Sequence, residues 1–130
     1  GQWVWGEALV YDGYVYIGTL DGKVHALKLA DGKEREPALK VDGAIRAGPA
    51  LLDGSLILGT EAGGIYKINV ETWDPEKSPK RLYTTEGAVL STPAVVGSKV
   101  YVGTTAGKIY ALDASNTDDP WLWEYPPKQK

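Results

Sequence analysis

Two pairs of tryptophans and a single histidine are the side chains in this 130-residue sequence that are best suited to binding or catalysis. Trp3 and Trp5 lie near the start of the chain, and Trp121 and Trp123 lie near its end, so each pair could stack on a planar ligand. The competing interpretation is that these rings pack in the interior. His25 could serve as a base or as a metal ligand.

An acidic cluster near the end of the sequence contains Asp113, Asp118 and Asp119, with Asn116 between them. Their oxygen atoms suit calcium, but the ligand spacing and the central glycine of a calcium-binding loop are missing. The chain contains no cysteine, which excludes a disulfide and a thiolate metal site. Because no phosphate loop or nucleophile elbow is present either, we assign no catalytic residue, no cofactor site and no metal site.

The charge of the chain argues against a nucleic-acid partner. Its 14 Lys and Arg and 17 Asp and Glu give a net charge of −3. The one basic cluster, Lys77, Lys80 and Arg81, is interrupted by Ser78 and Pro79, whereas binding to a phosphate backbone depends on clustered cations. No apolar run approaches the roughly 18 residues that a membrane-spanning helix needs, so we expect no such helix.

An internal repeat sets the positions of these side chains. Segments that begin at Gly18, Gly59 and Gly103 align without a gap, with spacings of 41 and 44 residues. His25 occupies the position that tyrosine holds in the other two copies, which favours a packed ring over a metal ligand or base. The residues that define the repeat signature are Gly18, Gly22, Gly59, Gly63, Gly103, Gly107, Pro49, Pro93 and Trp121.

Each copy predicts four short strands linked by turns. The first strands are short apolar runs that end in Asp-Gly or Gly-Ser, pairs that favour tight hairpins. The second and third strands are rich in β-branched and aromatic residues, and the fourth are weaker. The predicted first strands are Leu9–Tyr11, Ala50–Leu52 and Ala94–Val96, and the predicted fourth strands are Ala38–Val41, Arg81–Thr84 and Trp121–Tyr125.

These strands predict an all-β fold of β-propeller blades, with three four-stranded antiparallel sheets. Most strands are apolar on both alternating faces, as at Val100–Val102, which indicates sheets covered on both sides. Sheets of four strands that repeat every 40-odd residues are typical of blades stacked on one another. We therefore interpret residues 1–130 as a single propeller segment, with blade repeats at about 1–41, 42–86 and 87–130.

The repeat resembles the pyrroloquinoline-quinone (PQQ)-type propeller repeat of quinoprotein dehydrogenases and BamB-like outer-membrane assembly proteins. The third copy matches best, through Pro93-Ala94-Val95, Val100–Thr104 and Lys108–Asp113. In that family a docking motif ends in a tryptophan that packs against the next blade. Trp121 keeps the spacing of this motif, whereas the first copy has Glu36 at that position and the second diverges.

The resemblance implies a non-catalytic scaffold that binds a protein or peptide, in an extracytoplasmic or periplasmic compartment. The alternative is a fragment of a PQQ-dependent dehydrogenase, and PQQ and calcium would be cofactors only in that case. The missing vicinal cysteines and docking tryptophans argue against it. By resemblance, the starts of the first strands line the mouth of a central channel. The copy-specific residues there, our candidate binding face, are Trp5, Glu7, Arg46 and Thr92.

Three blades fall short of the four to eight that close a propeller. An exposed blade face of about 500 Å² forgoes roughly 12 kcal/mol of burial, an upper bound comparable to the stability of a whole domain. The chain is thus predicted to be half or a fragment of a larger propeller. Either the rest of a longer chain completes the ring, or two copies pair about a two-fold axis to give six blades. For the isolated chain we expect self-association.

Overall fold

The computed structural model describes residues 3–128, which form twelve strands and no helix. The strands make three four-stranded antiparallel sheets, as the repeat predicts, and in each sheet the strands follow their order in the chain. Sheet 1 contains β1 (Leu9–Tyr11), β2 (Tyr14–Gly18), β3 (Lys23–Lys28) and β4 (Glu34–Lys40). Sheet 2 contains β5 (Ala50–Leu52), β6 (Ser55–Gly59), β7 (Gly64–Asn69) and β8 (Lys80–Thr84). Sheet 3 contains β9 (Ala94–Val96), β10 (Lys99–Gly103), β11 (Ile109–Asp113) and β12 (Trp121–Tyr125).

The first two strands of each sheet are joined by a two-residue hairpin. In sheet 1, Tyr11 pairs with Tyr14, which leaves Asp12 and Gly13 as the turn. Both turn residues have positive φ, 48° and 81°, a conformation that suits the Asp-Gly pair. The Asp-Gly pair of sheet 2 and the Gly-Ser pair of sheet 3 hold the same place between their strands.

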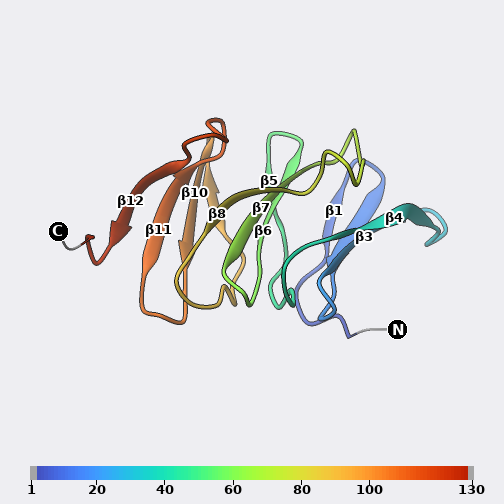
Figure 1. Cartoon of the computed structure of the whole chain (residues 1–130). Coiled ribbons are helices and arrows are strands. Elements are labelled where there is room, and N and C mark those ends of the chain that lie inside the picture. The colour runs from blue at the N-terminus through green and yellow to red at the C-terminus, as the bar shows by residue number, and fades with distance from the viewer. Residues whose placement is uncertain (1–2, 129–130) are drawn as a thin grey trace.

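The three sheets stand face to face in a row, with sheet 2 in the middle (Figure 1). Two separate apolar cores fill the spaces between them. Tyr16 and Val24 of sheet 1 meet Leu56 and Ile68 of sheet 2 in the first core. Ile57 of sheet 2 belongs to the second core, together with residues of sheet 3. Neighbouring residues of β6 therefore point into different cores, because successive side chains of a strand face opposite sides.

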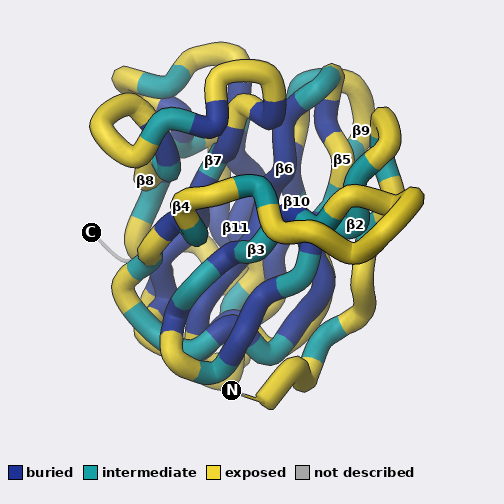
Figure 2. The backbone as a smooth tube through the Cα atoms, turned by 90° about the vertical axis from the view of Figure 1, so that its right-hand side faces the viewer, coloured by how far each residue is buried: buried dark blue, intermediate teal, exposed yellow. Residues whose placement is uncertain are grey.

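Burial follows from this arrangement. All five residues of β6 in the middle sheet are buried, whereas β2 and β10 in the outer sheets have buried and partly exposed residues. Figure 2 shows the buried residues along the strands and the exposed residues in the loops around them. A strand that is apolar on both faces is thus fully covered in sheet 2 and covered on one face in sheets 1 and 3. No helix of residues 3–128 has the length and apolarity to cross a membrane.

The fourth strand of sheet 1 begins earlier than the sequence predicts. We expect Ala38–Val41, but β4 runs from Glu34 to Lys40. Its first half is polar and contains Pro37, so it carries no apolar strand pattern. It is nevertheless a strand, because Glu34 and Arg35 pair with β3 across an irregularity in the register.

Each sheet is preceded by an equivalent stretch of chain, called here its lead segment. The lead segments are residues 3–8, 44–49 and 88–93, which lead into β1, β5 and β9. Each lead segment is tied to the turn between the second and third strands of its own sheet. The Leu20 N–H donates to the Trp3 carbonyl at 3.1 Å, and Glu61 and Thr105 repeat this bond with Ala44 and Ala88 at 2.9 and 3.0 Å. All three lead segments are therefore anchored in the same way.

Candidate functional site

The four residues of the predicted binding face line one groove. Trp5, Glu7, Arg46 and Thr92 surround a space of about 300 Å³, here called the inner groove, where the three lead segments converge. The first two lead segments touch closely, since a Cβ atom built on Gly6 would lie 2.4 Å from the Ala47 carbonyl carbon. Three chain segments that are far apart in sequence thus bring the copy-specific residues together.

Arg46 and Glu7 are the charged residues that line the inner groove. Arg46 Nε donates a hydrogen bond to Glu61 Oε2 at 2.9 Å, and its guanidinium lies 5.6 Å from the centre of the Trp5 ring. Both contacts hold the side chain across the groove while leaving about a third of it exposed. A guanidinium that is stacked on an aromatic ring and open to solvent can bind a carboxylate ligand by donating hydrogen bonds to it.

The other candidate groups are distributed over the molecule. His25 Nδ1 lies 2.8 Å from Glu34 Oε2 on neighbouring strands of sheet 1. Trp3 and Trp5 precede sheet 1, whereas Trp121 and Trp123 lie in β12 of sheet 3. The four tryptophans therefore belong to opposite ends of the row of sheets.

The acidic cluster is used for turn formation. Asp113 accepts hydrogen bonds from the backbone N–H and the hydroxyl of Ser115, at 3.0 and 2.6 Å, and these bonds lower the pKa of its carboxyl group. Asp118 lies 3.9 Å from Lys80 Nζ on sheet 2. Within residues 3–128, no three His, Cys, Asp or Glu side chains are grouped so as to hold a metal ion.

The tryptophan of the docking motif, Trp121, lies in the last of the three sheets, so residues 3–128 contain no following sheet against which it could pack. Trp121 packs against the core between sheets 2 and 3, not against a following sheet. Its Nε1–H donates to Glu124 Oε1 at 3.2 Å, and Lys128 Nζ lies 4.2 Å from the centre of its ring. Trp121 therefore stabilises a contact inside the chain.

A second tryptophan, which sequence reasoning left unassigned, connects sheets 1 and 2. Trp73 is buried in the first core, and its Nε1–H donates to the Pro37 carbonyl of β4 at 2.9 Å. Arg35 of β4 donates to the carbonyl groups of Val70 and Glu71 at 2.7 and 3.1 Å, and its guanidinium lies 5.6 Å from the centre of the Trp73 ring. The sequence signal that could have identified Trp73 is that it is a large aromatic residue in an otherwise polar linker.

The first signature glycine makes room for a side chain of the next sheet in two of the three copies. A Cβ atom on Gly18 would lie 2.3 Å from Ile45 Cγ2, and one on Gly59 would lie 2.3 Å from Val89 Cγ1. Ile45 and Val89 belong to the lead segments of the next sheet. In sheets 1 and 2 these glycines are therefore required because the backbone and a lead-segment side chain are in direct contact.

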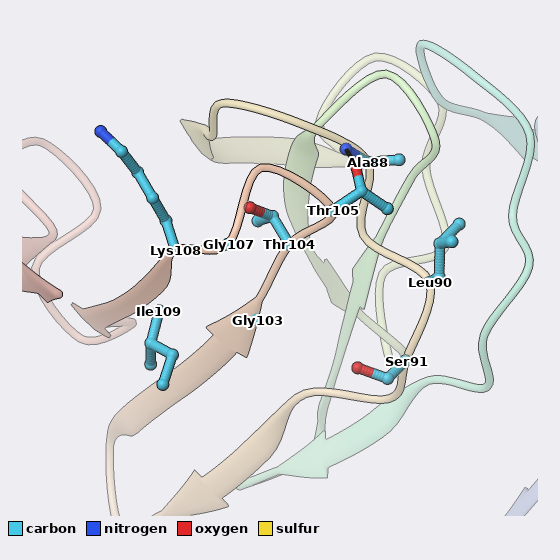
Figure 3. Close-up of a pocket in the computed structure, with 9 residues that line it drawn as sticks. All are labelled: Ala88, Leu90, Ser91, Gly103, Thr104, Thr105, Gly107, Lys108 and Ile109. Carbon is cyan, nitrogen blue, oxygen red and sulfur yellow. Dashed lines mark hydrogen bonds between the residues drawn. The ribbon is translucent and has the colours of Figure 1, made fainter. Parts of the chain in front are cut away.

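The third copy of this contact is open. A Cβ atom on Gly103 would meet no atom within 4 Å, and the same holds for Gly107. A space of about 420 Å³, here called the end groove, lies beside them, as Figure 3 shows. The residues that line the end groove are Ala88, Leu90, Ser91, Gly103, Thr104, Thr105, Gly107, Lys108 and Ile109.

Comparison with known proteins places this architecture. The family model described as outer membrane protein assembly factor BamB matches residues 2–128. No curated protein matches the sequence. Among solved structures, BamB from Moraxella catarrhalis is similar with a TM-score of 0.75 and 21% identity, over 95% of this chain and 37% of that one.

Two further structures share the fold. The computationally designed Ika4 protein has a TM-score of 0.78 and 14% identity, over 99% of this chain and 76% of that one. A quinohemoprotein alcohol dehydrogenase from Pseudomonas putida HK5 has a TM-score of 0.75 and 21% identity, over 95% of this chain and 20% of that one. The chain thus spans little more than a third of the BamB structure and a fifth of the dehydrogenase. With its PQQ-like repeats and its match over residues 2–128, the chain belongs to the family of the outer membrane protein assembly factor BamB.

Proposed function

We propose that the chain is a non-catalytic scaffold that binds a protein or peptide and that associates with a second copy of itself to complete a propeller ring. The observation that carries this proposal is the uncovered apolar face at each end of the row of sheets. Ile109 on the free face of sheet 3 is 46% exposed, whereas its counterpart Ile65 in sheet 2 is fully buried. Apolar faces of this kind mark sites of association.

The opposite end of the row is uncovered as well. Val15, Ile17 and Leu27 on the free face of sheet 1 are partly exposed, whereas their counterparts in sheet 2, Leu56, Leu58 and Ile68, are buried. The chain therefore carries two free faces. One corresponds to the first side of a complete contact between sheets, and the other corresponds to the second side. The rest of a longer propeller chain is the other means of covering them.

The mass in solution tests self-association. We expect light scattering to give twice the 14.0 kDa mass of the chain at micromolar concentration, with dissociation on dilution. A well-folded monomer of 14.0 kDa over the whole concentration range would contradict the proposal and favour completion by further blades of a longer chain. Circular dichroism at each concentration establishes that the species compared are folded.

The inner groove is the proposed binding face. Arg46 stacked on Trp5 favours a ligand that carries carboxylates, such as an acidic peptide. We expect a poly-glutamate peptide to change the tryptophan fluorescence of the chain in a saturable manner, and Arg46→Gln to weaken this binding about fivefold or more. Arg81→Gln, which removes an exposed arginine of β8, is the matched control. Equal binding by both variants would exclude the inner groove.

A fragment of a PQQ-dependent dehydrogenase remains the alternative function, and the structure of the quinohemoprotein alcohol dehydrogenase shares the fold. Residues 3–128 do not fit a calcium site, because they contain no suitable group of three acidic or histidine side chains. A spectral titration with PQQ and calcium separates the two functions. Saturable binding together with dye-linked oxidation of an alcohol would overturn the scaffold proposal.

A further inference from the structure

Two complete contacts between neighbouring sheets show what a third would require. Ile45, from the lead segment of sheet 2, donates its N–H to the Thr19 carbonyl of sheet 1 at 3.2 Å and covers Gly18 with its side chain. Val89, from the lead segment of sheet 3, donates in the same way to Thr60 of sheet 2 at 3.0 Å. Both aliphatic side chains are fully buried. At this point both contacts between sheets share one buried β-branched side chain and one backbone hydrogen bond.

The receiving half of a third contact is present in sheet 3. Gly103 and Thr104 occupy the positions that Gly18 and Thr19 hold in sheet 1, and the end groove lies where the next β-branched side chain would sit (Figure 3). The end groove is therefore an open, mainly apolar space beside Gly103.

The inserting half is present at the other end of the chain. Val4 lies 41 residues before Ile45 and 85 before Val89, so it occupies the same position in the repeat. It is 49% exposed, whereas Ile45 and Val89 are fully buried. The bond from Leu20 to the Trp3 carbonyl holds this lead segment as the other two are held. Val4 is therefore a β-branched side chain, already held by its lead segment, that no sheet within residues 3–128 covers.

We propose that the end groove is the docking site for a second copy of this chain, whose Val4 lies against Gly103 and whose Val4 N–H donates to the Thr104 carbonyl. This rests on the self-association proposed above and specifies its geometry. A second copy is the proposed occupant, since one chain carries both unmatched halves of a contact that it makes twice internally. Further blades of a longer chain are the other occupant, and a monomer at all concentrations would favour them.

The faces on either side of this contact agree with the assignment. Sheets 1 and 2 each contact the following sheet through one face, and the same face is free in sheet 3. Its apolar side chains are Val96, Tyr101, Ile109 and Trp123. Sheets 2 and 3 contact the preceding sheet through their opposite face, and that face is free in sheet 1. Its apolar side chains are Val10, Val15, Ile17 and Leu27. The two copies therefore meet head to tail, and a closed pair has two identical contacts of this kind.

Disulfide trapping tests the geometry, because the chain has no cysteine of its own. A mixture of the Val4→Cys and Gly103→Cys variants is expected to form a covalent dimer under oxidation, and either variant alone is not. In the equivalent internal contact, the Cβ built on Gly59 lies 2.7 Å from Val89 Cβ, about 1 Å closer than in a disulfide. The double variant Gly59→Cys, Val89→Cys, which bridges within one chain after a small shift, is thus the positive control.

A second variant decides the question without depending on disulfide geometry. Val4→Asp adds a charge where the chain alone leaves the side chain half exposed, so its circular dichroism and its urea midpoint should match those of the wild type at a concentration at which both are monomeric. We expect its dimer dissociation constant to rise about tenfold or more, since the burial of one valine is lost at each of the two contacts. Leu51→Asp, at a comparably exposed residue of the middle sheet, is the control and should leave the dissociation constant unchanged.

The outcomes separate this contact from self-association in general. A dimer by light scattering, with a bridge in the internal control and none in the mixture, would overturn the Val4 contact and leave self-association standing. Equal bridging by Val4→Cys alone would also overturn it, because that result requires a head-to-head contact. A monomer at all concentrations would overturn both.

Discussion

The signature glycines lead to a quantitative prediction for the free energy of unfolding. In Gly59→Ala, the new methyl group would lie 2.3, 2.7 and 3.1 Å from three carbon atoms of Val89, which is fully buried. Neither partner can move freely, so we expect an overpacking cost of about 1–3 kcal/mol. Gly103→Ala meets no atom within 4 Å, and Gly103 is not in the left-handed region. It should be neutral or stabilising by up to about 1 kcal/mol, because alanine restricts the unfolded chain.

Urea unfolding followed by circular dichroism measures the difference. The comparison is made at a protein concentration low enough for the wild type to be monomeric, so that association does not contribute to the free energy. We expect Gly59→Ala to lie roughly 1–4 kcal/mol below Gly103→Ala, with similar slopes against urea. Equal stability of the two alanine variants would refute the assignment of Gly59 to a contact between sheets.

A double-mutant cycle identifies the group that causes the clash. Val89→Ala removes Cγ1 and Cγ2, the atoms at 2.3 and 3.1 Å from the new methyl group, and keeps Cβ at 2.7 Å. By itself it costs stability because it leaves a cavity. Combined with Gly59→Ala, it should recover part of the loss, with a coupling of about 0.5–2 kcal/mol. If the two losses simply add, the cost of Gly59→Ala arises from its own strand and not from Val89.

Two further predictions concern the cores and the response to acid. In urea unfolding, Trp73→Ala should lower the free energy of unfolding by about 3–5 kcal/mol, because its ring is buried between two sheets. Trp123→Ala, at an exposed ring, should lower it by less than about 1 kcal/mol. Equal losses would contradict the role of Trp73 between the sheets. Burial alone would raise the pKa of Glu124, but hydrogen bonds from Lys108 and Trp121 outweigh it and hold the pKa below its ordinary value of 4.5. The stability that Glu124 contributes is therefore present above that value and is lost as the pH falls through the lowered pKa. Glu124→Gln should show a smaller drop in urea midpoint between pH 7 and pH 3 than the wild type, and an unchanged drop would contradict this account.

The strand order and the number of sheets could be predicted because they depend on short-range patterns. Asp12-Gly13 and its counterparts specify tight turns, and the apolar alternation of the strands between them requires sheets covered on both sides. The start of β4 could not be predicted in this way. Glu34 and Arg35 are polar, and their strand conformation depends on pairing with β3 and on contacts that Arg35 makes with sheet 2.

The candidate site shows the same division. Comparison of the three copies indicated Trp5, Glu7, Arg46 and Thr92 because they differ where the rest of the repeat agrees. That these residues line one groove depends on the convergence of the three lead segments, which no local pattern specifies. The partner of Arg46 is likewise set by tertiary structure, since Glu61 lies on a different loop of the same sheet.

The sequence by itself determined that three copies of one unit are present and that each must be covered by neighbours, because turn chemistry and alternating apolarity act over a few residues. Only the tertiary structure decided which glycines are in contact with another segment. Gly18, Gly59 and Gly103 are equivalent in the repeat, yet the first two are filled by Ile45 and Val89 and the third faces open space. The physical reason is that a contact between sheets requires two surfaces, and the third sheet carries one surface whose counterpart, at Val4, lies at the other end of the chain.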